Sequence, residues 1–231
     1  MDSDKNLERH RAYRHILDLI IGGEVDAKAP LSERRLSGHL QIGRTPVREA
    51  LRDLVRDGVL EVHPARGTYV REMSLNDIRE IYEVRHALEG LAAFLAAENG
   101  PTDGLAAFGP LFEGMVRDPA AFDPEVVYQR GVDFHLEVFR AAGNRNLLAT
   151  YEPIRLRFKI AFGLPRFYDH KRVIESVTEH LDVLRAIEAG DGAAAQTMIC
   201  DHLSAGLLAR MKIFEDIKRL RPVAIAREAS G

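Results

Sequence analysis

Apolar residues recur at helical spacing in the first sixty residues of the chain. Apolar positions 12, 16, 19 and 20 predict a helix over residues 6–21, which ends at "GGE". A second, short helix is expected to follow Ser32 as its N-cap. For the third helix we expect Thr45 as the N-cap, Pro46 as the first helical residue and Gly58 as the stop.

The pattern then becomes typical of strands. The runs "VLEVH" and "GTYVRE" are short and β-prone, and "PARG" between them indicates a hairpin connection. The turn between the second and third helices is expected at "QIGR", with Gly43 as the conformationally permissive residue. Three short helices followed by a hairpin predict a winged helix-turn-helix domain at residues 1–72.

The remainder of the chain has a helical pattern with no strand signal and no internal repeat. We expect helices at residues 74–99, 103–117, 124–142, 145–163, 170–189 and 191–219. The predicted fold class is therefore mainly α, with the N-terminal winged helix-turn-helix followed by an all-α helical bundle of about six helices at residues 73–231.

Composition and charge bear on where the protein is located and which partners it has. The net charge of the chain is -3, but residues 1–72 hold 13 Lys and Arg against 12 Asp and Glu, whereas the rest is acidic. The single cysteine, Cys200, cannot form an intrachain disulfide. The N-terminus has no signal-peptide core, and no apolar run approaches the roughly 18 residues of a membrane span. We therefore expect a cytoplasmic protein with no membrane partner.

Arginines mark one side of the third predicted helix. Arg48, Arg52 and Arg56 follow one another at intervals of four residues, and Arg44 lies four residues before Arg48. Arginine can pair bidentately with guanine, and a helix N-terminus favours phosphate. An exposed helix whose arginines are balanced by acidic neighbours is the alternative, but the hairpin context favours DNA. The predicted DNA-binding residues are Arg34, Arg44, Thr45, Pro46, Arg48, Arg52, Arg66 and Gly67.

Residues 31–70 resemble the DNA-binding domain of the GntR family of bacterial transcription regulators. The resemblance rests on "RTPVREAL", on the exit "DGVLEV" and on the wing pattern "PARGTYV". Gly43 departs from the family, which usually has Ser there, and "DAKAPL" stands where a "PG" turn is usual. Double-stranded operator DNA is the implied partner. Since one winged helix contacts few bases, we expect a homodimer on a palindromic site.

Most of residues 75–215 resemble the all-helical FCD-type ligand-binding domain of the FadR subfamily. The motifs are "IYEVRHALEGLAA", "FHLEVFRAAGNRNLL" and "EHLDVLRAIEAGD". In many members an Asp and three His bind a divalent metal on which a small carboxylate effector docks. The resemblance implies that His135, His180 and His202 are metal ligands here, and three imidazoles suit zinc or nickel. Gly131 replaces the family's Asp.

The helix faces around these histidines are apolar, so each imidazole is expected to point inward. Asp133 cannot replace the missing carboxylate, because two residues turn about 200° around a helix. Two interpretations stay open: a three-His metal site and a metal-free polar pocket. If the histidines converge, Gly131→Asp is expected to tighten metal binding.

Two arginines are candidates for binding the effector. Arg85 can clamp a carboxylate bidentately, but it can equally form an ion pair with Glu89 on the same helix face. Arg155 lies four residues before Lys159, and exposed cations on a solvated face explain that pair as well. Both alternatives stay open.

These patterns together predict a transcription regulator, and specifically a repressor released from DNA by a small carboxylate metabolite. No enzymatic activity is expected. The alternative is a metal-dependent hydrolase or lyase that uses the histidine cluster. Against it, no carboxylate lies on the local helix face of any of the three histidines to serve as a base.

Overall fold

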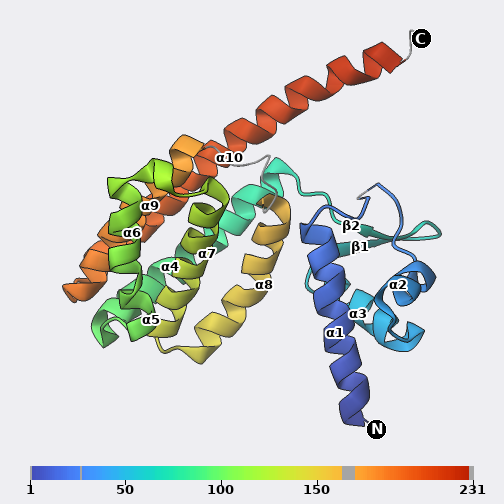
Figure 1. Ribbon diagram of the computed structural model, residues 1–231, viewed down its shortest axis with the longest axis horizontal. Helices are drawn as coiled ribbons and strands as arrows, with labels where there is room; N and C mark the ends of the chain where they lie inside the picture. The colour runs from blue at the N-terminus through green and yellow to red at the C-terminus, as the bar shows by residue number, and fades with distance from the viewer. Residues whose placement is uncertain (1, 27, 163–169, 229–231) are drawn as a thin grey trace. The chain divides into compact units, whose positions relative to one another are not determined.

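The computed structural model describes residues 2–26, 28–162 and 170–228 (Figure 1). Most of the described residues are helical, and their strands form a single antiparallel pair. The mainly α fold class is therefore confirmed. The chain divides into two compact units.

The first unit comprises Met1–Met73 and Pro153–Leu164. Its N-terminal elements are α1 (Asp2–Ile21), α2 (Glu33–Leu40), α3 (Arg44–Arg56), β1 (Leu60–His63) and β2 (Gly67–Val70). The two strands pair from Leu60↔Val70 to His63↔Gly67. Three helices followed by a hairpin are the predicted winged helix-turn-helix.

The start of α3 differs from the prediction. Gly43, not Thr45, is the N-cap, and Arg44 is the first helical residue. Pro46 is the third helical residue, where it is tolerated because amides of the first turn have no intrahelical acceptor. The left-handed residue of the preceding turn is Gln41 (φ 54°), whereas Gly43 has φ −57°. Arg44 and Thr45 consequently both lie in the first turn of α3.

Carboxylates on α3 hold α1 beside the shared apolar core. Arg9 of α1 donates two hydrogen bonds to Asp53, at 2.5 and 2.7 Å, and Tyr13 donates one to Asp57 at 2.7 Å. The hydrogen bond from Arg9 lowers the pKa of Asp53. This side of α3 therefore faces α1, which leaves the other side for solvent.

Beyond residue 73 the described structure is helical. Its helices are α4 (Leu75–Asn99), α5 (Asp103–Ala106), α6 (Phe108–Arg117), the 3-10 turn η1 (Pro119–Ala121), α7 (Pro124–Ala141), α8 (Arg145–Phe162), α9 (His170–Glu188) and α10 (Gly192–Glu228). These are seven described α-helices instead of about six. The additional helix arises because α5 and α6 replace the single helix expected at residues 103–117. Pro110 has no amide hydrogen to donate to the carbonyl of Ala106, so α5 ends and α6 begins.

The second unit, Ser74–Glu152 with Pro165–Gly231, has its own core. Phe112 and Phe134 are fully buried and meet edge to face, with 5.4 Å between ring centroids. Helix α4 packs against α10, and its buried residues include the small side chains Ala92, Ala93, Ala96 and Ala97. Small side chains allow helix backbones to approach closely. Among the described helices, none has the length and apolarity to cross a membrane.

Candidate functional site

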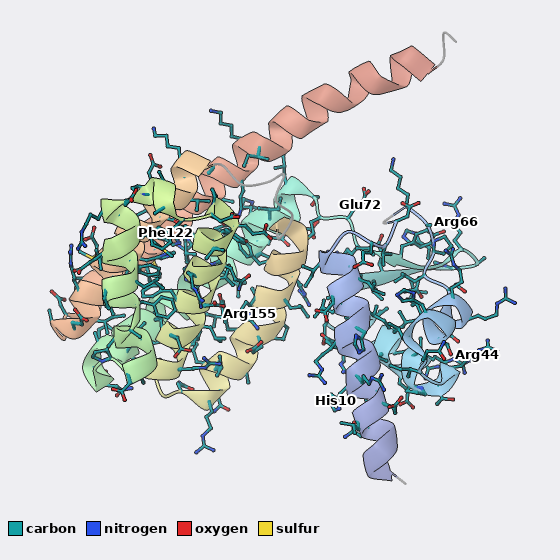
Figure 2. All side chains as sticks on the ribbon, viewed as in Figure 1. His10, Arg44, Arg66, Glu72, Phe122 and Arg155 are labelled. Carbon is teal, nitrogen blue, oxygen red and sulfur yellow. The ribbon has the colours of Figure 1, made fainter. Side chains whose placement is uncertain are left out.

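The predicted DNA-binding residues form an outer face of the first unit. Seven of the eight are exposed, and Pro46 is half-buried. Arg44 and Thr45 begin α3, while Arg66 and Gly67 lie at the hairpin (Figure 2). The opposite side of α3 is buried in the core. This arrangement leaves the arginines accessible to a large, charged partner.

Two arginines of α3 are ion-paired. Arg48 Nε lies 3.1 Å from each carboxylate oxygen of Glu33, the first residue of α2 after its predicted N-cap Ser32. Arg56 Nη2 lies 2.7 Å from Asp53, the carboxylate that also holds Arg9 of α1. Arg48 and Arg56 are therefore partly neutralised, whereas Arg52 has no ion-pair partner among the described residues.

The three histidines converge in the second unit. His135 lies on α7, His180 on α9 and His202 on α10, and their exposed fractions are 7%, 2% and 9%. Nε2 of His180 lies 3.2 Å from Nε2 of His135 and 3.2 Å from Nε2 of His202. Three helices that are far apart in sequence thus bring three imidazoles to one buried point.

Glu89 of α4 connects His135 to Arg85. Glu89 Oε2 lies 2.6 Å from His135 Nδ1, and Glu89 Oε1 accepts a hydrogen bond from Arg85 Nε at 2.6 Å. Burial alone would raise the pKa of Glu89, but Arg85 and His135 hold it at about 2. The carboxylate is therefore ionised, although it is almost completely buried.

Glu179 of α9 connects His202 to Arg172 in the same way. His202 Nδ1 lies 2.7 Å from Glu179 Oε2, and Arg172 donates to both oxygens of Glu179, at 2.9 and 2.6 Å. We call the two sets, Arg85–Glu89–His135 and Arg172–Glu179–His202, the Arg–Glu–His relays. Carboxylates that accept from Nδ1 are the usual partners of metal-ligating histidines.

The relays determine which nitrogen carries the proton. A carboxylate can only accept, so Nδ1 of His202 holds the hydrogen that Glu179 accepts, and the carboxylate 2.6 Å from Nδ1 of His135 favours the same tautomer there. In that tautomer each Nε2 presents a lone pair toward His180. A single hydrogen on Nε2 of His180 cannot make full hydrogen bonds to both. Burial holds the pKa values of His180 and His202 well below the ordinary value for histidine, so both are neutral at pH 7.

The donor set fits a divalent transition metal. A tetrahedral ion with metal–nitrogen bonds of about 2.0–2.1 Å needs nitrogens about 3.3 Å apart, and Nε2 of His180 lies 3.2 Å from each of the other two Nε2 atoms. Neutral imidazoles with their Nδ1 protons held by carboxylates are the ligands that zinc and nickel prefer. Such an ion would use all three lone pairs at once.

Gly131 is buried one helical turn before His135. A Cβ at this position would lie 2.9 Å from Cε1 of His180. An aspartate there would have to displace the His180 ring, so tighter metal binding by Gly131→Asp does not follow, although the histidines converge. Asp133 is directed elsewhere, toward Gln129 at 3.0 Å and Arg130 at 3.6 Å, as the helix geometry predicts.

The two candidate effector residues have different surroundings. Arg85 is paired with Glu89, and the two side chains are 5% and 2% exposed, so the ion-pair alternative describes this contact. Arg155 is half-buried on α8, in the stretch that belongs to the first unit (Figure 2). Effector binding by either residue stays a prediction.

Sequence reasoning missed both carboxylate–histidine contacts, although it considered the Arg85–Glu89 pair. The argument that no carboxylate accompanies the histidines considered only each histidine's own helix face. Glu89 reaches His135 from another helix, and Glu179 reaches His202 from another helix. The available signal was the seven-residue spacing of Arg172 and Glu179, which places them on one face of α9.

Two family models match the chain. The model described as "Bacterial regulatory proteins, gntR family" matches residues 8–70, and the model of the FCD domain matches residues 80–205, more than half of the chain. The chain belongs to the GntR family and carries an FCD domain. This GntR-family protein is thus a transcription regulator with a DNA-binding head and a helical ligand-binding domain.

Individual relatives agree with this assignment. The regulator is 30% identical over 209 residues to the "Probable D-xylose utilization operon transcriptional repressor" of Paenarthrobacter nicotinovorans, covering 89% of this chain and 91% of the relative. Its fold is similar to that of Escherichia coli McbR/YncC, with a TM-score of 0.74 and 22% identity over 90% and 98% of the two chains. The metal-free FCD domain of TM0439 gives a TM-score of 0.52 at 22% identity, over 63% and 99% of the two chains. The hydrolase or lyase alternative finds no support in these relatives.

Proposed function

We propose that this regulator binds palindromic operator DNA as a homodimer and represses transcription until a small carboxylate metabolite binds its FCD domain. The observation that carries the effector part is the convergence of three buried imidazoles, two of them beside carboxylates. The relative named as a repressor supports the direction of control.

The DNA half of the proposal uses the outer face of the winged helix. Arg44, Thr45, Arg48 and Arg52 on α3 contact bases or phosphates in the major groove, while Arg34 on α2 and Arg66 on the hairpin add contacts on either side. A twofold dimer doubles this small contact surface, and a palindromic operator matches its symmetry.

The effector half uses His135, His180 and His202 to hold a zinc or nickel ion. When bound, the metal supplies a Lewis-acidic centre to which carboxylate oxygens can coordinate. Because Gly131 provides no anionic ligand, the three imidazoles leave the ion's full double charge, which favours an anionic effector. Arg85 lies beside the site as the ion-pair partner of Glu89, whose other oxygen is 2.6 Å from Nδ1 of His135.

Effector binding can release DNA only if the two conformations of the regulator differ in effector affinity. The coupling is reciprocal, so operator DNA must weaken effector binding by the same factor. The effect of the effector on DNA affinity and the effect of DNA on effector affinity can therefore be measured separately and compared.

Metal analysis of the full chain, purified without a histidine tag, tests the proposal. We expect about one zinc or nickel ion per chain after chelator-free dialysis, almost none in His180→Ala, and wild-type content in the control His86→Ala. His86 is suited to this role because it lies on α4 outside the cluster, where its Nε2 lies 3.4 Å from Ser204 Oγ. A wild-type chain that neither retains nor takes up metal would overturn the effector half.

A thermal-shift screen with small carboxylates completes the test. We expect a stabilising acid to act on the metal-loaded protein and not on the stripped protein. The same acid should release the regulator from a DNA duplex selected from a random library. An acid that stabilises the stripped protein equally would point to the metal-free polar pocket instead.

A further inference from the structure

The ion pair between Arg48 and Glu33 joins the two helices of the helix-turn-helix. Glu33 begins α2 and Arg48 lies in the second turn of α3, fifteen residues later. Both carboxylate oxygens lie 3.1 Å from Arg48 Nε. Among the described residues, Arg48 is the one predicted DNA-binding arginine with an ion-pair partner.

The contact uses one particular edge of the guanidinium. Arginine has one hydrogen on Nε and four on the two terminal nitrogens, all in a fixed plane. A bidentate contact to guanine O6 and N7 needs two parallel N–H groups. Since Glu33 accepts the Nε–H, the edge formed by Nη1 and Nη2 remains free for a base. The contact to Glu33 also fixes the orientation of the guanidinium plane.

A carboxylate at this face opposes non-specific binding. The other charged members of the predicted DNA-binding face are cationic, namely Arg34, Arg44, Arg52 and Arg66. These arginines attract any phosphate backbone, and Glu33 repels it. Its side chain is 32% exposed, and that of Arg48 is 48% exposed, so both remain within reach of DNA.

We propose that Glu33 is a specificity-determining positioning residue, which holds Arg48 for base recognition and lowers the affinity for unrelated DNA. The inference rests on the proposed DNA-binding function. Orientation of Arg48 raises affinity for the correct base, and repulsion lowers affinity for every sequence. Only the first effect raises the ratio of specific to non-specific affinity, because a uniform repulsion lowers both affinities by the same factor.

The test compares Glu33→Gln with two matched variants of the full chain. Glu49→Gln removes the same charge from an exposed position of α3 that forms no ion pair with Arg48 among the described residues. Arg48→Ala removes the positioned group. A duplex selected from a random library by the wild-type chain and an unrelated duplex of equal length are the probes.

We expect Glu33→Gln to lower the ratio of specific to non-specific affinity roughly tenfold, the scale of one bidentate base contact. Reselection with this variant should relax the preference at one G·C pair, a readout that a purely structural role would not move. In the Arg48→Ala background, Glu33→Gln should have no further effect on that preference. Glu49→Gln should leave the selected sequence unchanged.

Two outcomes would count against the inference in different ways. If Glu33→Gln binds both duplexes more tightly by the same factor, with base preference unchanged, Glu33 only offsets charge and the positioning role is wrong. If the wild-type chain selects no sequence at all, the proposed DNA-binding function fails, and the inference fails with it.

Discussion

The two units hold the same kind of ion pair in opposite environments. Arg48 and Glu33 are 48% and 32% exposed and lie 3.1 Å apart, whereas Arg85 and Glu89 are 5% and 2% exposed and lie 2.6 Å apart. An exposed pair contributes about 0–1 kcal/mol to stability. Breaking a buried pair leaves an uncompensated charge, which costs about 3–5 kcal/mol. The first pair therefore adds little to stability, whereas the buried Arg85 charge of the second depends on Glu89 for its compensation.

Glu89→Gln should have the largest effect on stability. The change leaves the buried Arg85 charge without its anionic partner and removes the carboxylate that orients His135. We expect the free energy of unfolding, measured by urea denaturation, to fall by about 3–5 kcal/mol. The exposed counterpart, Glu33→Gln, should change it by less than about 1 kcal/mol. Equal effects in the two variants would contradict the comparison.

Gly131→Ala should weaken metal binding without adding or removing a charge. The new Cβ would lie 2.9 Å from His180 Cε1, so the ring must shift from the position that places its Nε2 between the other two imidazoles. We expect roughly 10–100-fold lower metal affinity, the scale seen when the surroundings of a ligand are disturbed. Competition with a chromophoric chelator measures it. The control Gly114→Ala meets nothing nearer than 4.0 Å and should keep wild-type affinity.

Asp53→Asn tests an intermediate case. The Asp53 side chain is 12% exposed, but its partners Arg9 and Arg56 are 35% and 69% exposed. We expect a loss of about 1–2 kcal/mol in the free energy of unfolding at pH 7. Because folding lowers the pKa of Asp53, its contribution is present above about pH 4 and is lost as the pH falls further. The wild type and the variant should therefore converge in stability at low pH.

Arg52→Ala should have the smallest effect, because this exposed side chain makes no described ion pair. Loss of one phosphate contact should weaken binding to all DNA a few-fold and reduce the slope of log affinity against log salt by about 1. Binding measured at several salt concentrations checks this. Arg117→Ala, which removes an exposed arginine from α6, is the matched control and should leave the slope unchanged.

The same contrast explains what could be predicted from the sequence. The winged helix was predictable because its signals are local: a four-residue arginine spacing, a hairpin turn and a stop at Gly58. Its errors were local too. Thr45 and Pro46 suit an N-cap and a first helical position, but Pro46 is also tolerated in the third, so the preference did not decide the boundary.

The histidine cluster was predictable only in part. Apolar helix faces indicate that the three histidines point inward, but only the resemblance to the FCD type brings them together. The contact between His202 and Glu179 joins residues 23 apart on different helices, and that between His135 and Glu89 joins α7 to α4. Helical spacing carries no information about contacts between helices, so the relays could not be derived from it.

Burial of the three imidazoles also sets a time scale. With His135, His180 and His202 no more than 9% exposed, an ion at their Nε2 atoms can leave only when the surrounding helices open. Exchange is then limited by the rate of opening and not by the concentration of chelator. If a metal is held there, it would behave on the time scale of regulation as a permanent part of the domain.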